Sequence, residues 1–118
     1  MVFFRADSNN TIASGHIMRC MSIAKEFIKR GIQVQFIIAD NNSVKMLSEA
    51  GMNYIVLDSD WKDLMSEVDR VRDILLQYDN PVMIVDTYSI EKEYVDAMKD
   101  YRCNSFCVDS HLHRLASH

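Results

Sequence analysis

The stretch that decides the fold is VFFRADSNNTIASGHIMRCMSIAKEFIKRGIQVQFIIA, residues 2–39. It begins with a short apolar run, passes through a polar segment and a stretch of helical periodicity, and ends in a second apolar run at residues 33–39. A strand, a helix and a second strand in this order are typical of a βαβ unit with parallel strands. Gly31 is expected to end the helix, with Lys25, Lys29 and Arg30 on its outer face. The apolar face consists of Ile17, Cys20, Met21, Ala24, Phe27 and Ile28.

The same alternation continues along the rest of the chain. Apolar runs at residues 2–5, 33–39, 54–57, 82–86 and 105–108 predict strands, and helices are expected between them. We therefore predict an α/β fold, a three-layer Rossmann-like parallel sheet of about five strands, with the first strand beside the fourth or third near the middle. The second helix is expected near residues 43–50, the third after a cap at Asp60, and the fourth around residues 94–101. The apolar stripe of the third helix is Trp61, Leu64, Met65, Val68, Val71 and Leu75.

Length and composition indicate one domain over residues 1–118. The chain is 48% hydrophobic and carries a formal net charge of -4, which gives no broad attraction to nucleic acid or acidic lipid. Cys20, Cys103 and Cys107 lack the spacing of a zinc or redox motif, which favours free thiols in the cytoplasm. We expect neither a signal peptide nor a membrane span, because no apolar run is long enough.

Polar residues follow four of the five predicted strands, at the edge where open α/β sheets bind ligands. The clusters are Arg5-Ala6-Asp7, Asp40-Asn41-Asn42, Asp86-Thr87-Tyr88 and Asp109-Ser110-His111. We interpret residues 40–42 as ordinary polar groups where a strand meets water. Asp86 and Asp109 each follow an apolar run, so a ligand contact and a helix cap or loop brace are both open.

The first of these clusters opens a polar loop, Ala6 to Ser14, that is longer than most connections in α/β units and is expected to bind a ligand. Gly15 would let an anion approach the backbone N–H groups at the helix start. In the first turn, the helix dipole disfavours an imidazolium, so His16 is a candidate general base. Arg19, three residues later, is a candidate to hold an anion beside it. The alternative is a partly exposed histidine with Arg19 paired to a surface carboxylate.

Other motifs are absent or weak. The chain has neither the glycine pattern of a dinucleotide site nor that of a Walker-type phosphate loop. His111, His113 and His118 lack a convincing set of further ligands, so we predict no metal site and no cofactor.

The segment RADSNNTIASGHIMRC, residues 5–20, resembles the N-terminal motif of the UDP-sugar hydrolases of pseudaminic acid biosynthesis and their spore-coat polysaccharide relatives. The family pattern is R-x-D, a polar spacer, and then I-G-x-G-H-x-x-R. Ala13 stands where the family usually has glycine. The matching residues are Arg5, Asp7, Ile12, Gly15, His16 and Arg19.

Two later segments resemble the same family. VMIVDTYSI is similar to the family's strand that ends in D-x-Y, and Asp86 and Tyr88 are the matching residues. CVDS is similar to a strand that ends in two aspartates. Asp109 matches the first of these, and Ser110 replaces the second.

The resemblance implies a GT-B arrangement of two Rossmann-like domains, of which this chain is the N-terminal, sugar-side half. The C-terminal nucleotide-binding domain would then be a partner missing from the chain, and the isolated chain would be inactive. The implied reaction is hydrolysis of a UDP-linked diacetamido-trideoxy sugar at its anomeric carbon, with inversion and without a metal or cofactor. His16 would be the general base. The implied substrate-binding residues are Arg5, Asp7, Gly15, Arg19, Asp86, Tyr88 and Asp109.

Two other functions stay open. One alternative is the N-terminal domain of a glycosyltransferase of the same architecture, in which a sugar or lipid replaces water as acceptor. The chain is also compatible with a binding or assembly module without catalysis, because Ala13 and Ser110 depart from the family pattern.

Overall fold

The sheet at the centre of the molecule is seen in a computed structural model that describes residues 1–7, 15–60, 63–78, 81–86 and 104–107. All of its strand pairs are parallel, in the order β3-β2-β1-β4-β5. This confirms the α/β class with a parallel sheet. The strands are β1 (Val2–Ala6), β2 (Val34–Ile38), β3 (Tyr54–Val56), β4 (Val82–Asp86) and β5 (Asn104–Cys107).

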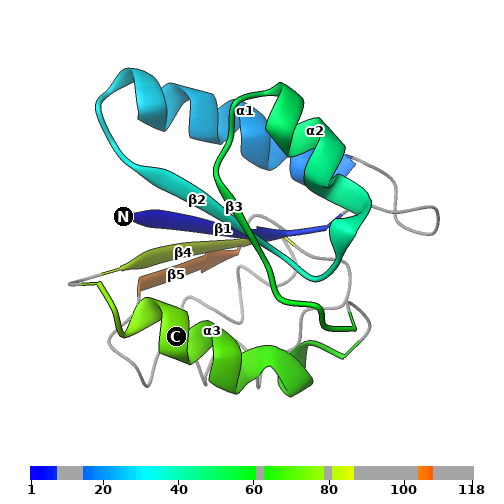
Figure 1. Cartoon of the computed structure of the whole chain (residues 1–118). Coiled ribbons are helices and arrows are strands. Elements are labelled where there is room, and N and C mark those ends of the chain that lie inside the picture. The colour runs from blue at the N-terminus through cyan, green and yellow to red at the C-terminus, as the bar shows by residue number, and fades with distance from the viewer. Residues whose placement is uncertain (8–14, 61–62, 79–80, 87–103, 108–118) are drawn as a thin grey trace.

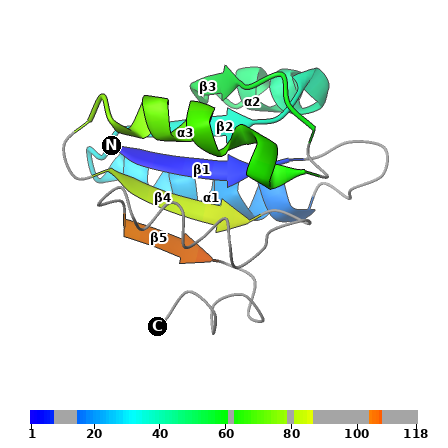
Figure 2. The same cartoon turned by 90° about the horizontal axis from the view of Figure 1, so that it is seen from below.

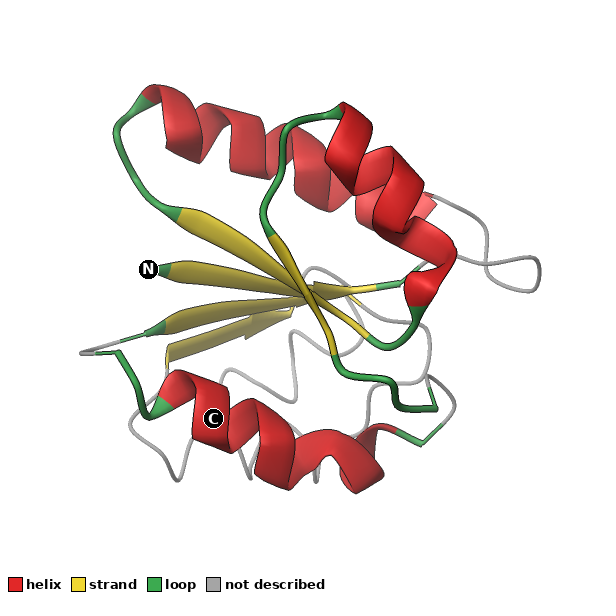
Figure 3. Ribbon diagram, viewed as in Figure 1, coloured by secondary structure: helices red, strands yellow, loops and turns green. Residues whose placement is uncertain are grey.

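Helices cover both faces of this sheet. Figure 1 shows α1 (Gly15–Lys29) and α2 (Val44–Glu49) on one face and α3 (Val68–Leu75) on the other, and the view from below in Figure 2 shows the strands side by side between them. The ribbon coloured by element type in Figure 3 shows the same three layers. The described part of the chain therefore has the layering of a doubly wound sheet.

Alternate residues of β1 build the two cores, because successive side chains of a strand point to opposite faces. Phe4 packs with Phe36 and Ile17 under α1 and α2, and the two phenyl rings stack at 5.2 Å between centroids. Phe3 packs with Val71 on the opposite face, under α3. The alternation places Arg5 on the α3 side of β1, in register with the core residues Ile37 and Val85.

The end of α1 follows from the glycine in the sequence. Gly31 has a φ of +79°, which L side chains rarely adopt. Its N–H donates to the carbonyl of Ile28, and the Ile32 N–H donates to that of Phe27, which closes a Schellman motif. The prediction that Gly31 ends the helix is confirmed.

Several predicted details of the helices are wrong. The third helix does not start after a cap at Asp60: a 3₁₀ helix, η2 (Leu64–Glu67), precedes α3, with Asp63 as the residue before it and Glu67 as the N-cap of α3. Met65 is exposed because the 3₁₀ turn breaks the helical spacing, whereas Val68, Val71 and Leu75 are buried as expected. Ile28 is half exposed at the end of α1. The fourth predicted helix lies outside the described residues.

The bounds of β1 to β4 lie within one residue of the predicted ranges, and β5 begins and ends one residue earlier than predicted. The structure describes the side-chain packing of β1 to β4, and of β5 only the backbone pairing with β4. Among the described helices, none is long and apolar enough to cross a bilayer.

Candidate functional site

The candidate site lies at the carboxyl edge of the sheet, between β1 and β4. The chain runs from β1 outward through β2 to β3, and then returns past β1 to form β4 on its other side, with α3 on the opposite face. Such a reversal creates the crevice in which open α/β sheets bind ligands. Ala6 pairs with Asp86 at this point, so the ends of the two strands are neighbours.

A buried ion-pair network lies at this edge. Arg5 and Glu67 have no solvent exposure and Asp7 has 4%. The Arg5 Nε and Nη2 atoms donate to the two carboxylate oxygens of Glu67, each at 2.7 Å, and Nη1 donates to Asp7 Oδ2 at 2.8 Å. Nη1 also lies 3.4 Å from the Ile37 carbonyl oxygen. The two-pronged contact with Glu67 is the strongest geometry available to an arginine and a carboxylate.

Asp7 connects this network to the neighbouring strand. Its Oδ1 atom accepts a hydrogen bond from the Ala39 N–H at 2.8 Å, while its Oδ2 atom accepts from Arg5. Asp7 is one residue beyond β1, and Ala39 is one residue beyond β2. The carboxylate therefore holds the ends of these two central strands together.

Glu67 is a site residue that the sequence did not indicate. It lies at the start of α3, where a negative charge interacts favourably with the helix dipole. A buried arginine on a central strand requires a buried carboxylate, so the position of Arg5 in the sequence indicates that such a partner exists. That indication does not select Glu67, because Asp58, Asp60 and Asp63 precede it in the same segment.

The burial of Arg5 bears on its predicted contact with substrate. Its guanidinium is enclosed and faces two carboxylates and two backbone carbonyls, so the geometry favours a role in positioning other groups. Substrate binding by Asp7 stays a prediction. Both of its oxygens already accept hydrogen bonds inside the protein.

The start of α1 lies at the same edge. The helix begins at Gly15, so His16 is in its first turn, as the sequence predicts. Gly15 and Arg19 are exposed, and a Cβ atom built on Gly15 would meet no described atom within 4 Å. As far as the described atoms go, the space beside Gly15 is compatible with a ligand close to the backbone. The side chain of His16 lies outside the described part of the structure.

The remaining predicted site residues are placed only in part. Asp86 ends β4 beside Ala6, with its side chain outside the description, and Tyr88 and Asp109 lie outside the described residues. Asp40 caps η1 (Asn41–Ser43), because its Oδ1 atom accepts from the Asn42 N–H at 3.0 Å. This agrees with an ordinary structural role for residues 40–42.

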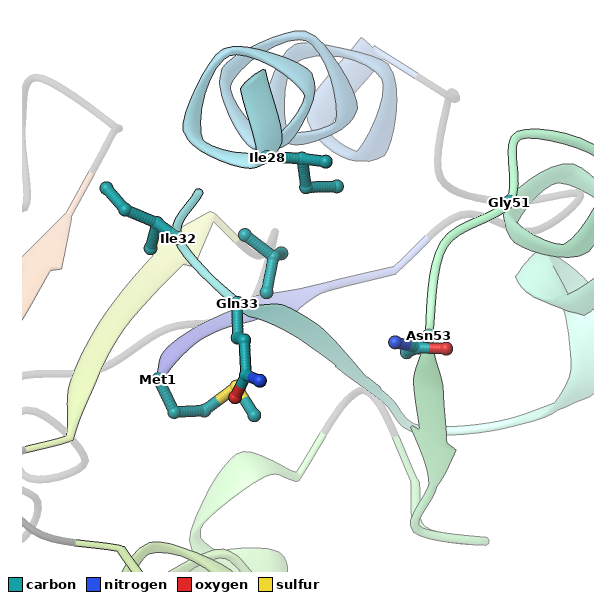
Figure 4. A pocket seen from close by; sticks show the side chains of 7 residues that line it. Met1, Ile28, Ile32, Gln33, Gly51 and Asn53 are labelled. Atoms are coloured by element: carbon teal, nitrogen blue, oxygen red, sulfur yellow. The ribbon is translucent and has the colours of Figure 1, made fainter. Parts of the chain in front are cut away.

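A cavity of about 430 Å³ lies at the opposite, amino edge of the sheet. Figure 4 shows Ile28 of α1, Ile32 and Gln33 before β2, and Asn53 before β3 around it. This cavity is at the far ends of the strands from the Arg5 network. It therefore contributes nothing to the site between β1 and β4.

Neither metal clusters nor relatives add to this description. In the part of the chain that the structure describes, no group of three or more His, Cys, Asp or Glu side chains is placed to hold a metal ion. Comparison of the chain with protein-family models, curated proteins and solved structures finds no match.

Proposed function

We propose that this chain is the N-terminal, sugar-side half of a UDP-sugar hydrolase with His16 as its general base. The observation that carries the proposal is the start of α1 at Gly15, which puts His16 in the first helical turn at the carboxyl edge of the sheet. This edge contains the reversal between β1 and β4. The motif that joins Arg5, Asp7, Gly15, His16 and Arg19 supports the same family.

The chemistry follows from a neutral imidazole, which the positive end of a helix favours. In the proposed reaction, His16 removes a proton from a water molecule as the water oxygen attacks the anomeric carbon. The bond between that carbon and the diphosphate oxygen breaks, and UDP leaves with the electron pair. General-base catalysis of this kind contributes about 10²–10⁴-fold in rate.

The proposal includes a GT-B partner domain that binds uridine and diphosphate at the C-terminal side. Among the predicted substrate contacts, Gly15 and Arg19 are exposed near the start of α1, which supports a role at the sugar. We also propose a reducing compartment, the cytoplasm, because Cys20, Cys103 and Cys107 lack the spacing of a zinc or redox motif.

The test is UDP release by a two-domain protein in which this chain is joined to a candidate C-terminal domain. His16→Ala is expected to lower kcat by about 10²–10⁴-fold, because the proton acceptor is lost. Lys25→Ala, an exposed change two turns further along α1, is the matched control and should retain the wild-type rate. Equal rates for His16→Ala and wild type would contradict the role of His16. Transfer of the sugar to an added acceptor in place of water would assign a glycosyltransferase instead.

A further inference from the structure

Arg5 occupies a position where a parallel sheet ordinarily has an apolar residue. Its register neighbours Ile37 and Val85 belong to the core under α3, and so does Phe3 two residues earlier. Central parallel strands are buried on both faces and usually read as apolar runs. A fully buried ion pair adds little net stability compared with apolar side chains of similar volume, because both charges lose their hydration. Stability alone therefore does not explain Arg5 and Glu67.

The network acts on the point where the chain leaves β1. Glu67 holds the guanidinium of Arg5 from the start of α3, and Arg5 holds one carboxylate oxygen of Asp7. The other oxygen of Asp7 accepts from Ala39 beyond β2. Asp7, the first residue after β1, is thus held directly by Arg5 and Ala39 and indirectly by Glu67.

We infer that Glu67 is a positioning residue of the candidate site: it orients Arg5, which fixes Asp7 at the point where the chain leaves β1. This inference rests on the proposed nucleotide-sugar function and extends it to a residue outside the family motif. Glu67 is fully buried, so it acts through Arg5 and Asp7 without touching the substrate. A residue that departs from the usual pattern of its element, such as a buried arginine on a central strand, is expected at a functional site.

The informative variants separate charge from packing. Glu67→Gln keeps the side-chain shape and removes the charge. The double variant Arg5→Met with Glu67→Leu removes the pair and fills its space with apolar groups, but leaves Asp7 buried without its cation. Asp69→Asn is the matched control, because Asp69 is an exposed carboxylate in the first turn of the same helix.

Two measurements on the chain itself test whether Glu67 and Arg5 position Asp7. The thermal midpoint reports stability, and the backbone amide signals of Ala39 and Gly15 in ¹H–¹⁵N spectra report the carboxyl edge. We expect the double variant to fold with a lower thermal midpoint than the wild type, because Asp7 stays buried without its cation. Its Ala39 amide proton should shift upfield, because Asp7 loses Arg5 and holds Ala39 less firmly. An unchanged Ala39 signal in a folded double variant would overturn the inference.

Hydrolysis by the two-domain protein adds the kinetic readout. We expect Glu67→Gln and the double variant each to lower kcat at least about tenfold, with KM changed less than about threefold and Asp69→Asn unchanged. Wild-type kcat in the folded double variant would overturn the positioning role. If the double variant does not fold, the Ala39 amide signal and the kcat of Glu67→Gln decide instead, both measured below the thermal midpoint of that variant. If the wild type does not hydrolyse the UDP-sugar, the proposed function fails, and the Ala39 and Gly15 signals still decide the structural part of the inference.

Discussion

Two arginine–glutamate pairs in this chain share their chemistry and differ in their surroundings. Arg5 and Glu67 are fully buried, 62 positions apart in sequence, and in contact at 2.7 Å. Glu26 lies in the last turn of α1 and Arg30 directly after the helix, with side chains 55% and 69% exposed and 3.4 Å between their nearest charged atoms. The first pair joins a central strand to a helix of the opposite layer, and the second joins the last turn of one helix to the residue after it.

The difference shows what burial changes. The exposed pair lies in water, so its attraction is weak and is screened by salt. The buried pair has lost its hydration, so each charge depends on a partner inside the protein. Arg5 accordingly faces Asp7 as well as Glu67. Removal of one member of each pair should therefore give very different losses.

The largest effect is expected from Arg5→Met. The substitution leaves Glu67 and Asp7 as buried carboxylates without their cation, and we expect the free energy of unfolding to fall by about 3–5 kcal/mol. Urea denaturation of the chain measures this loss. Arg30→Met is the control from the exposed pair and should change the free energy by less than about 1 kcal/mol. Similar losses in the two variants would mean that the buried network does not hold the carboxyl edge together.

A second pair of variants measures the effect of burial on stability at positions without charge. Ile17 is fully buried against the sheet on the face covered by α1, where the core is apolar. Ile17→Ala should cost about 2–5 kcal/mol, because it removes apolar contacts and leaves a cavity. Its neighbour Met18 is 56% exposed, so Met18→Ala is the control and should cost no more than about 0.5 kcal/mol. A loss for Ile17→Ala as small as that for Met18→Ala would show that α1 is not packed on the sheet through this residue.

The comparison of the two pairs also shows how far the sequence predicts the molecule. The apolar runs predict the parallel sheet, because its strands are buried on both faces, and the 3.6-residue periodicity predicts the buried face of α1. Gly31 predicts the end of α1 through its positive φ. The pair of Glu26 and Arg30 is visible from spacing alone, since residues four apart on a helix are neighbours.

The buried pair is not visible in this way. Arg5 and Glu67 meet only because the return of the chain past β1 brings the start of α3 over the carboxyl edge. No local pattern encodes that contact, and the 3₁₀ turn before α3 displaces the helix start that the periodicity predicted. The sequence therefore predicts which segments form the candidate site, Arg5 to Asp7 and Gly15 to Arg19. It does not predict that Glu67 is the buried partner of Arg5.

The smallest effect is expected at the exposed pair. Glu26→Gln should lower the free energy of unfolding by about 0.2–0.5 kcal/mol, since a glutamate four residues before an arginine on a helix contributes only this much. The loss should disappear as salt rises from about 0.01 M to about 1 M, because the Debye length falls from about 30 Å to about 3 Å. Urea denaturation at both salt concentrations checks this, with Arg5→Met measured in parallel. The buried pair is screened much less, so its loss should persist at high salt, and a loss for Glu26→Gln that survives high salt would contradict the assignment of that pair to weak surface attraction.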